Sequence, residues 1–334
     1  MKIAVVGIGV AGAYTVNRLS KEHDVIGFER MNEENHDSIC AWGTTKTDMS
    51  KLARKCDLNF EDYLLHDGLN LRVEAGTNSF AVRLNGLCTY DKIKLIRDMS
   101  HGIKIHYGKA PSKAILEQDF DLIVDATGFH RILLPKPKNE LWIPTIQYKV
   151  KYEKVPFTDF MIRPFPSMTG YFWYFPLEDG YAHIGAGDKH RRHVKIVNDF
   201  LDKHNGQILK KVGRPLRLSP PALCEPFYDG KVVGVGESIG TVFALFGEGI
   251  IPSTICADLF VENINNLPRY RELVLEKFKI YHTVFNFVKN KINNEFSMMK
   301  HLPDLIRIYS YMKRREDRFG MEIKMADMIK ITKV

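Results

Sequence analysis

The chain has 334 residues, 45% of them hydrophobic, which suffices for one large domain or two ordinary ones with a buried core. Its apolar runs are too short to cross a bilayer, and no signal-peptide pattern precedes the first strand. Five scattered cysteines without a C-x-x-C pair argue against disulfides and against a metal site. We therefore expect a cytoplasmic protein. No RNA-binding or zinc-finger pattern accompanies the formal net charge of +8, so nucleic acid is not an expected partner.

The first elements form a dinucleotide-binding pattern. A short β-branched run at 2–6 predicts a buried parallel strand, and the G-x-G-x-x-G motif with Gly7, Gly9 and Gly12 leads from it into a helix. Gly7 permits the tight turn, Gly9 lets the backbone approach a pyrophosphate, and Gly12 allows close helix–strand packing. The helix N-terminus adds N–H groups and a positive dipole end for a phosphate.

The second strand of this unit ends in an acid. Residues 24–28 predict the strand, and Glu29 closes it with Arg30 beside it. The carboxylate of Glu29 is placed to accept hydrogen bonds from the 2′-OH of an adenosine ribose. The order of strand, glycine loop, helix, strand and acid therefore predicts a dinucleotide site.

Two segments before the next strand contain further candidate side chains. Residues 38–43 read S-I-C-A-W-G, a loop with Cys40 and Gly43, and simple packing is the alternative to a role for the thiol. Residues 87–99 predict a helix with its start signal at Thr89 to Asp91. An ordinary capped surface helix is the alternative to a helix beside the site.

A buried strand at 121–128 then ends in Ala126, Thr127 and Gly128, and an antiparallel sheet is predicted after it. The hairpin at 171–187 within that sheet reads Y-F-W-Y-F-P-L-E-D-G-Y-A-H-I-G-A-G. Strand alternation puts three of its aromatic side chains on one face. These residues are Tyr171, Trp173 and Phe175. The two aromatic residues between them point to the other face, so a two-sided aromatic core is the alternative to a pocket wall.

A late strand and a glycine-rich loop complete the nucleotide-binding elements. The strand at 231–236 ends in Gly236 and is followed by Glu237. The loop then leads through Gly247 and Gly249 to Ile250, which begins a helix predicted to reach Asn263.

The positive charge is concentrated in two segments. Residues 189–217 contain nine Lys and Arg against two Asp, and residues 299–334 contain nine against five acids. Such segments attract phosphates or anionic lipid surfaces, and a solvated face is the alternative. Apolar stripes beside these basic clusters fit a helix on a lipid surface and core-packed helices about equally. A peripheral membrane contact through the basic segments and a solvated basic face are therefore the two interpretations.

The hairpin pattern Y-x-W-x-F-P, eight residues, then G-x-G resembles the signature of the geranylgeranyl reductase family, within the FAD-dependent aromatic-hydroxylase-like superfamily. The resemblance implies FAD as the cofactor. It implies as cofactor-binding residues Gly7, Gly9, Gly12, Glu29, Arg30, Ala126, Thr127, Gly128, Gly236, Glu237, Gly247, Gly249 and Ile250. It implies as substrate-binding residues Tyr171, Trp173, Phe175, Pro176, Gly185 and Gly187. It places Cys40 and Gly43 in a loop over the flavin and the substrate, with a catalytic role, and the segment from Tyr90 to Lys92 beside the flavin.

The chain departs from the family pattern at two acids. Glu237 stands where the family carries Asp, which keeps the carboxylate for ribityl hydrogen bonds but adds a methylene. Glu248 interrupts the glycines of the late loop. Its charge near a reduced flavin would be unfavourable, so we expect Glu248 to face solvent at the helix start, where the helix dipole favours it.

The expected fold is α/β. It has a Rossmann-like FAD-binding domain of the glutathione-reductase type at 1–140 and 220–265, an inserted antiparallel-sheet substrate domain at 141–219, and a helical region at 266–334. The expected function is reduction of C=C bonds in an isoprenoid, either lipid-linked or a diphosphate. A flavin monooxygenase or dehydrogenase, and a non-catalytic flavoprotein, are the alternatives. No second G-x-G-x-x-G is present, so the electron donor stays open.

Overall fold

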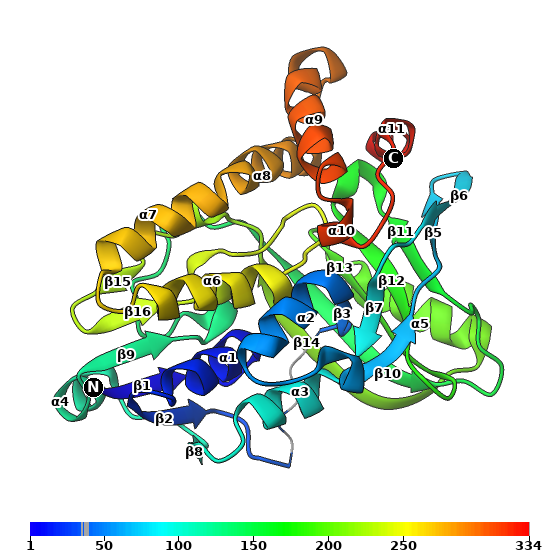
Figure 1. Ribbon diagram of the computed structural model, residues 1–334. Helices are drawn as coiled ribbons and strands as arrows, with labels where there is room; N and C mark the ends of the chain where they lie inside the picture. The colour runs from blue at the N-terminus through cyan, green and yellow to red at the C-terminus, as the bar shows by residue number, and fades with distance from the viewer. Residues whose placement is uncertain (35, 37–39, 334) are drawn as a thin grey trace.

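A six-stranded sheet carries the nucleotide-binding unit in the computed structural model, which describes residues 1–34, 36 and 40–333 (Figure 1). The strand order is β15-β16-β9-β1-β2-β8, and all neighbours are parallel except β15 with β16. The strands are β1 (Lys2–Val6), β2 (Asp24–Glu29), β8 (Lys104–Tyr107), β9 (Leu122–Asp125), β15 (Tyr228–Asp229) and β16 (Val232–Gly234). β9 is buried at every position, as expected for a central parallel strand covered on both faces.

Helices α1 and α6 pack against each other beside this sheet, with α3 next to α1. The helices of the first 262 residues are α1 (Val10–Leu19), α2 (Lys46–Lys55), α3 (Lys92–Met99), α4 (Lys113–Asp119), α5 (His193–His204) and α6 (Ile250–Glu262). The helix predicted at 87–99 is wrong in its first part. Leu87–Tyr90 form strand β7, since Thr89 and Tyr90 favour an extended chain that pairs with both neighbours. Asp91 then caps α3 by accepting a hydrogen bond from the Lys94 N–H at 2.9 Å.

The second large sheet has seven strands in the order β14-β10-β13-β12-β11-β5-β6. Its strands are β5 (Asn70–Ala75), β6 (Asn78–Arg83), β10 (Trp142–Lys151), β11 (Phe160–Pro164), β12 (Gly170–Pro176), β13 (Tyr181–Asp188) and β14 (Gln207–Arg217). The predicted hairpin is confirmed as the β12–β13 pair, in which Trp173 lies opposite Gly185. Only β11 and β5 run parallel, and through this pair residues 70–83 join a sheet otherwise made from residues 142–217.

A small third sheet, β3-β7-β4, lies beside α2. Its strands are β3 (Gly43–Thr45), β4 (Leu64–Asp67) and β7. The hydroxyl of Thr89 in β7 donates to the carbonyl of Pro176 at 2.6 Å, and so links this sheet to the end of β12.

The C-terminal region is helical, as predicted. Its helices are α7 (Leu267–Lys277), α8 (Lys279–Ile292), α9 (Met298–Lys313), α10 (Glu316–Phe319) and α11 (Met325–Thr332). Figure 1 shows α9 rising beyond the body of the molecule, with α11 next to it near the C-terminus. Within the described residues, no helix has the length and apolar character needed to cross a membrane. The structure thus confirms a mixed α/β fold with a parallel sheet and a helical C-terminus.

Candidate functional site

A cavity of about 680 Å³ is lined by the ends of the six-stranded sheet, the hairpin and the C-terminal helices. Most of the predicted site residues lie on its wall. Those residues are Gly7, Gly9, Glu29, Arg30, Cys40, Gly43, Ala126, Thr127, Gly128, Tyr171, Trp173, Phe175, Gly187, Glu237, Gly247, Gly249 and Ile250. Gly12, Pro176, Gly185 and Gly236 are absent from the wall and lie behind it in the packing.

The glycine motif has the geometry that each of its positions predicts. Gly7 has φ +92°, and a Cβ there would lie 2.6 Å from the carbonyl oxygen of Ala126. A Cβ at Gly12 would lie 1.9 Å from the carbonyl oxygen of Gly7. Around Gly9, in contrast, no atom lies within 4 Å of such a Cβ. Gly9 caps α1 without a side-chain bond, and the first turn holds no acid. The positive end of α1 therefore meets open cavity space, as an anionic pyrophosphate requires.

Glu29 is fixed at the end of β2. Its carboxylate accepts hydrogen bonds from the N–H of Ile8 at 2.8 Å and of Met31 at 3.0 Å. A carboxylate has about four acceptor positions, so it can also accept from hydroxyl groups of a ligand, beside the His36 Nε2 that lies 3.7 Å from Oε2. The backbone bond to Ile8 also ties the acid to the glycine motif, and so joins the two halves of the predicted nucleotide site.

Glu237 is held by two arginines of β14. Its Oε1 accepts the N–H of Arg217 at 3.0 Å, and its Oε2 pairs with Arg214 at 3.0 Å. The guanidinium of Arg217 also donates to the carbonyl of Glu237 at 2.6 Å. The carboxylate of Glu237 thus already has two partners at the cavity wall, and its hydrogen bonding to the ribityl chain of a flavin stays a prediction. The sequence reasoning missed both arginines because β14 enters this site only through the folding of the second sheet.

Glu248 does not face solvent, so the expectation for this residue is wrong. Both of its carboxylate oxygens accept from Nη2 of Arg318, at 2.9 and 2.6 Å, and Arg318 lies 3.5 Å from Asp48. The side chain of Arg318 is only 12% exposed. Burial by itself lowers the pKa of Arg318, but Glu248 and Asp48 outweigh it and raise the pKa, so the guanidinium stays charged. No local motif signals Arg318, which comes from α10, 70 residues further along the chain.

The two aromatic faces of β12 have different surroundings. Tyr171, Trp173 and Phe175 line the cavity, whereas Phe172 and Tyr174 belong to a core cluster with α5. The hydroxyl of Tyr171 donates to the carbonyl of Phe246, in the glycine-rich loop before α6. The hairpin is thereby joined to the loop that begins the last cofactor element.

Two glycines allow these rings to pack closely. A Cβ at Gly185 would lie 2.4 Å from the indole of Trp173, and a Cβ at Gly43 would lie 2.4 Å from the ring of Phe175. Both positions therefore need glycine for a packing reason. The close approach of Gly43 to Phe175 connects the S-I-C-A-W-G loop to the hairpin, although Ser38 and Ile39 of that loop lie outside the described residues.

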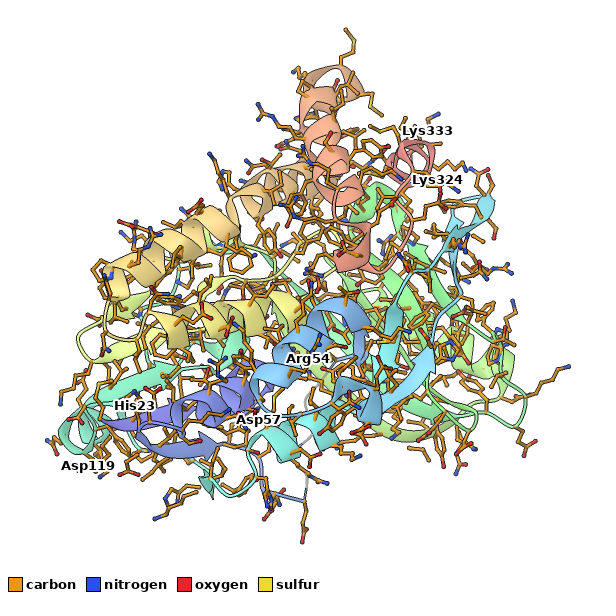
Figure 2. The ribbon with its side chains drawn as sticks, in the orientation of Figure 1. His23, Arg54, Asp57, Asp119, Lys324 and Lys333 are labelled. Atoms are coloured by element: carbon orange, nitrogen blue, oxygen red, sulfur yellow. The ribbon has the colours of Figure 1, made fainter. Side chains whose placement is uncertain are left out.

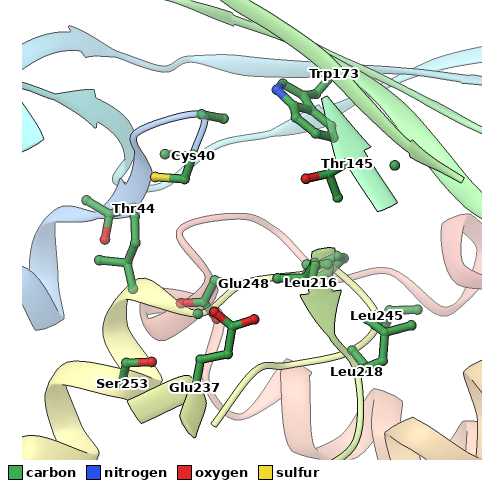
Figure 3. A pocket seen from close by; sticks show the side chains of 18 of the residues that line it. Cys40, Thr44, Thr145, Trp173, Leu216, Leu218, Glu237, Leu245, Glu248 and Ser253 are labelled. Carbon is green, nitrogen blue, oxygen red and sulfur yellow. The ribbon is translucent and has the colours of Figure 1, made fainter. Parts of the chain in front are cut away.

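Cys40 lies at the cavity with a basic neighbour. Its Sγ accepts from Nζ of Lys92 at 3.0 Å, and its carbonyl accepts from Nε2 of Gln147 at 2.5 Å. Figure 3 shows Cys40 and Trp173 across the cavity from Glu237 and Glu248. Within the described residues, the buried Oε1 of Gln147 and Nε1 of Trp173 have no hydrogen-bond partner. Both residues line the cavity, but these two atoms are themselves covered by protein.

The part of the cavity away from the glycine motif has many apolar side chains on its wall, beside the charged Arg318, Glu322, Lys324 and Asp327. Strands β5, β6 and β11 contribute Leu71, Val73, Val82 and Ile162. The C-terminal helices contribute Phe287, Val288, Ile292, Leu305, Met312, Met328 and Ile331. The sequence reasoning did not assign any of these residues to the site, because their periodicity is the same as that of ordinary core residues.

Fold and site together allow a comparison with known proteins. The arrangement of a parallel sheet with a glycine motif, joined to a large second sheet over one cavity, is shared with solved structures that match most of the chain. A geranylgeranyl bacteriochlorophyll reductase-like protein from Thermoplasma acidophilum superposes with a TM-score of 0.70 at 16% identity, covering 92% of this chain and 90% of that one.

Two further proteins match most of the chain. A probable FAD-dependent monooxygenase from Pseudomonas aeruginosa gives a TM-score of 0.66 at 11% identity, over 92% of this chain and 99% of that one. An uncharacterized protein of Methanocaldococcus jannaschii is 22% identical over 330 residues, covering 83% of this chain and 88% of its own. No family model matches the chain. The predicted resemblance is thus confirmed at the level of the fold.

Proposed function

We propose that the chain binds FAD and reduces C=C bonds of an isoprenoid substrate. The open space at Gly9, the uncapped start of α1 and the fixed carboxylate of Glu29 fit the pyrophosphate and adenosine ribose of FAD. Reduced FAD, supplied with two electrons by an external donor, would deliver a hydride to one alkene carbon, and a proton would be added to the other. In this proposal, residues of the chain bind the cofactor, exclude water and hold the substrate against the flavin.

The observation that carries the substrate class is the apolar wall. Tyr171, Trp173 and Phe175 point into the same cavity as the glycine motif, and the wall continues over apolar side chains of α8, α9 and α11. A long hydrocarbon gains free energy by burying its surface, at roughly 25 cal/mol per Å². A surface of this kind, next to a nucleotide site, suits a prenyl chain better than a polar substrate.

The neighbours of Glu248 support chemistry with a reduced flavin. The ion pair with Arg318 balances the negative charge of Glu248 at the start of α6. The ion pair thereby reduces the Coulomb repulsion between Glu248 and a flavin that gains electrons. This supports a cavity that tolerates the reduced cofactor despite the departure from the family pattern.

The finer fold assignment is part of the same proposal. Residues 1–140 and 220–265 contribute all six strands of the first sheet, and residues 141–219 contribute five strands of the second. This division supports a nucleotide-binding domain of the glutathione-reductase type with an inserted substrate domain. Residues 70–83 add two strands to the second sheet from outside the proposed insertion.

Anaerobic reoxidation tests the proposal. We expect the purified protein to show a visible flavin absorbance band, to be bleached by dithionite, and to regain the band when a geranylgeranyl lipid or diphosphate is added without oxygen. Absence of the band, with no uptake of added FAD, would contradict both cofactor and reaction. A bound flavin that ignores every isoprenoid but consumes oxygen with another substrate would favour a monooxygenase, an alternative that the Pseudomonas likeness makes specific.

A further inference from the structure

One face of α9 exposes apolar side chains to solvent. Met299 is 92% exposed, Leu302 is 43% exposed and Ile306 is 46% exposed. Their spacing of three and four residues puts them on the same side of the helix. The opposite side, with Leu305 and Ile308, is fully buried. We infer that the exposed face of α9, called here the α9 face and made of Met299, Leu302 and Ile306, docks on the surface of an anionic lipid bilayer.

The charge around the α9 face fits an anionic surface. Lys300 and Arg307, both exposed, flank the apolar side chains on the same helix. Within α9 there are three Lys and Arg and one acid, the half-buried Asp304. Figure 2 shows Lys324 and Lys333 at α11 next to this helix, and Lys324 pairs with Glu322 at 2.9 Å. Apolar side chains surrounded by cations are the pattern of a helix that lies in the membrane interface.

The size of the α9 face also favours a bilayer over a protein. A stable protein partner normally buries roughly 800 Å² on each side, more than three side chains on one protruding helix provide. An interfacial helix needs only shallow insertion of its apolar side chains, to roughly 5–10 Å. The position of α9 beyond the body of the molecule leaves this face accessible to a flat surface.

The α9 face lies directly behind the cavity wall. Leu305 and Met312, on the inner side of the same helix, line the cavity together with Met328 and Ile331 of α11. A prenyl chain that leaves a bilayer beside α9 and α11 would reach the apolar end of the cavity over a short path. This last step rests on the proposed function, whereas docking of the α9 face does not.

Vesicle flotation tests the inference. The purified full chain is mixed with vesicles of phosphatidylcholine plus phosphatidylglycerol, or of phosphatidylcholine alone, all without isoprenoid. We expect flotation with the anionic vesicles that weakens as salt increases. Leu302→Asp and Ile306→Asp should each lower the vesicle-binding constant at least about tenfold, because a buried aliphatic side chain is replaced by a charge. Lys300→Gln should lower it about fivefold with anionic vesicles only.

A matched control separates the α9 face from general hydrophobicity. Ile115 on α4 lies outside both basic segments and is 50% exposed, an exposed fraction similar to those of Leu302 and Ile306, so Ile115→Asp should leave flotation unchanged. Thermal unfolding of each variant verifies that it folds. If the wild type stays with the buffer fraction, or if Ile115→Asp and Leu302→Asp reduce flotation equally, the inference is wrong. It is also wrong if light scattering shows a dimer that Ile306→Asp converts to a monomer, since the face would then bind a second copy.

Failure of this inference is distinguishable from failure of the proposed function. Reoxidation of the reduced flavin by a detergent-dispersed isoprenoid reports the reaction without a bilayer. Flotation reports docking without turnover. Reoxidation without flotation overturns only the docking of the α9 face, and flotation without reoxidation overturns only the reaction.

Discussion

Loss of the Arg318 side chain should leave a buried charge at the cavity and destabilise the protein. In the variant Arg318→Met the carboxylate of Glu248, 19% exposed, loses both of its hydrogen bonds from Nη2. Two unit charges about 4 Å apart attract by about 4 kcal/mol at an effective dielectric constant of 20. Removal of one partner of a buried pair costs about 3–5 kcal/mol. We expect the free energy of unfolding to fall by about 3 kcal/mol, because part of the carboxylate can hydrate.

A double-mutant cycle isolates the pair. Glu248→Gln should cost less, about 1–2 kcal/mol, since Arg318 keeps Asp48 at 3.5 Å. Combining both changes removes both charges, so the double variant should be more stable than the sum of the single losses by about 2 kcal/mol. The assay is urea unfolding at neutral pH, followed by far-UV circular dichroism. The exposed pair of Lys195 with Asp199 serves as the control. Its removal should change stability by less than about 0.5 kcal/mol.

The outcome that refutes this reasoning is additivity. If Arg318→Met and Glu248→Gln lower stability independently, the two side chains do not form the pair seen here. A loss below about 0.5 kcal/mol for Arg318→Met would show that the carboxylate is hydrated or protonated without cost. Either result would also remove the support that this pair gives to a reduced flavin in the cavity.

Three other changes test separate parts of the structure. Burial raises the pKa of Asp188, but hydrogen bonds from Arg192 outweigh it and lower the pKa from 3.8 to about 2. The stabilisation from the ionised Asp188 is fully present above pH 3.8 and is lost as the pH falls through about 2. In Asp188→Asn the free energy of unfolding should therefore fall by about 2 kcal/mol less over this pH range than in the wild type. An unchanged dependence of stability on acid pH would contradict this prediction. Gly9→Ala places its Cβ in open space, so it should keep the unfolding free energy of the apoprotein and weaken FAD binding at least about tenfold. Gly12→Ala should instead destabilise the fold itself by about 1–3 kcal/mol. Equal changes in the melting temperature of the two variants would refute this distinction. Trp173→Leu should raise the KM for an isoprenoid about tenfold, and an unchanged KM would remove its side chain from the substrate wall.

The local elements of the nucleotide site could be predicted because each depends on near neighbours in sequence. The strand, the glycine motif, the helix and Glu29 all lie within about 30 residues, and their spacing alone determines the turn geometry. The helix from Ile250 is confirmed for the same reason, since Gly249 and the apolar run after it are contiguous. The hairpin also follows from local alternation.

The errors occur where distant segments meet. Leu87–Tyr90 has both helical and extended potential, and pairing with β3 and β4 decides for the strand. Arg318 pairs with Glu248 across 70 residues, and Arg214 reaches Glu237 from another sheet. No periodicity encodes such contacts, because a surface arginine and a buried arginine look the same in a local pattern.

Strand β12 shows which functional features the local sequence pattern predicts and which depend on tertiary packing. Alternation places Tyr171, Trp173 and Phe175 on one face and two aromatic residues on the other, but it does not say which face meets a core and which meets a cavity. Helix α5 covers the second face, and the first face lines the cavity that also contains the glycine motif. A strand with two aromatic faces is therefore needed here for two different reasons. One face stabilises the sheet against α5, and the other supplies the flat apolar wall on which the proposed substrate class depends.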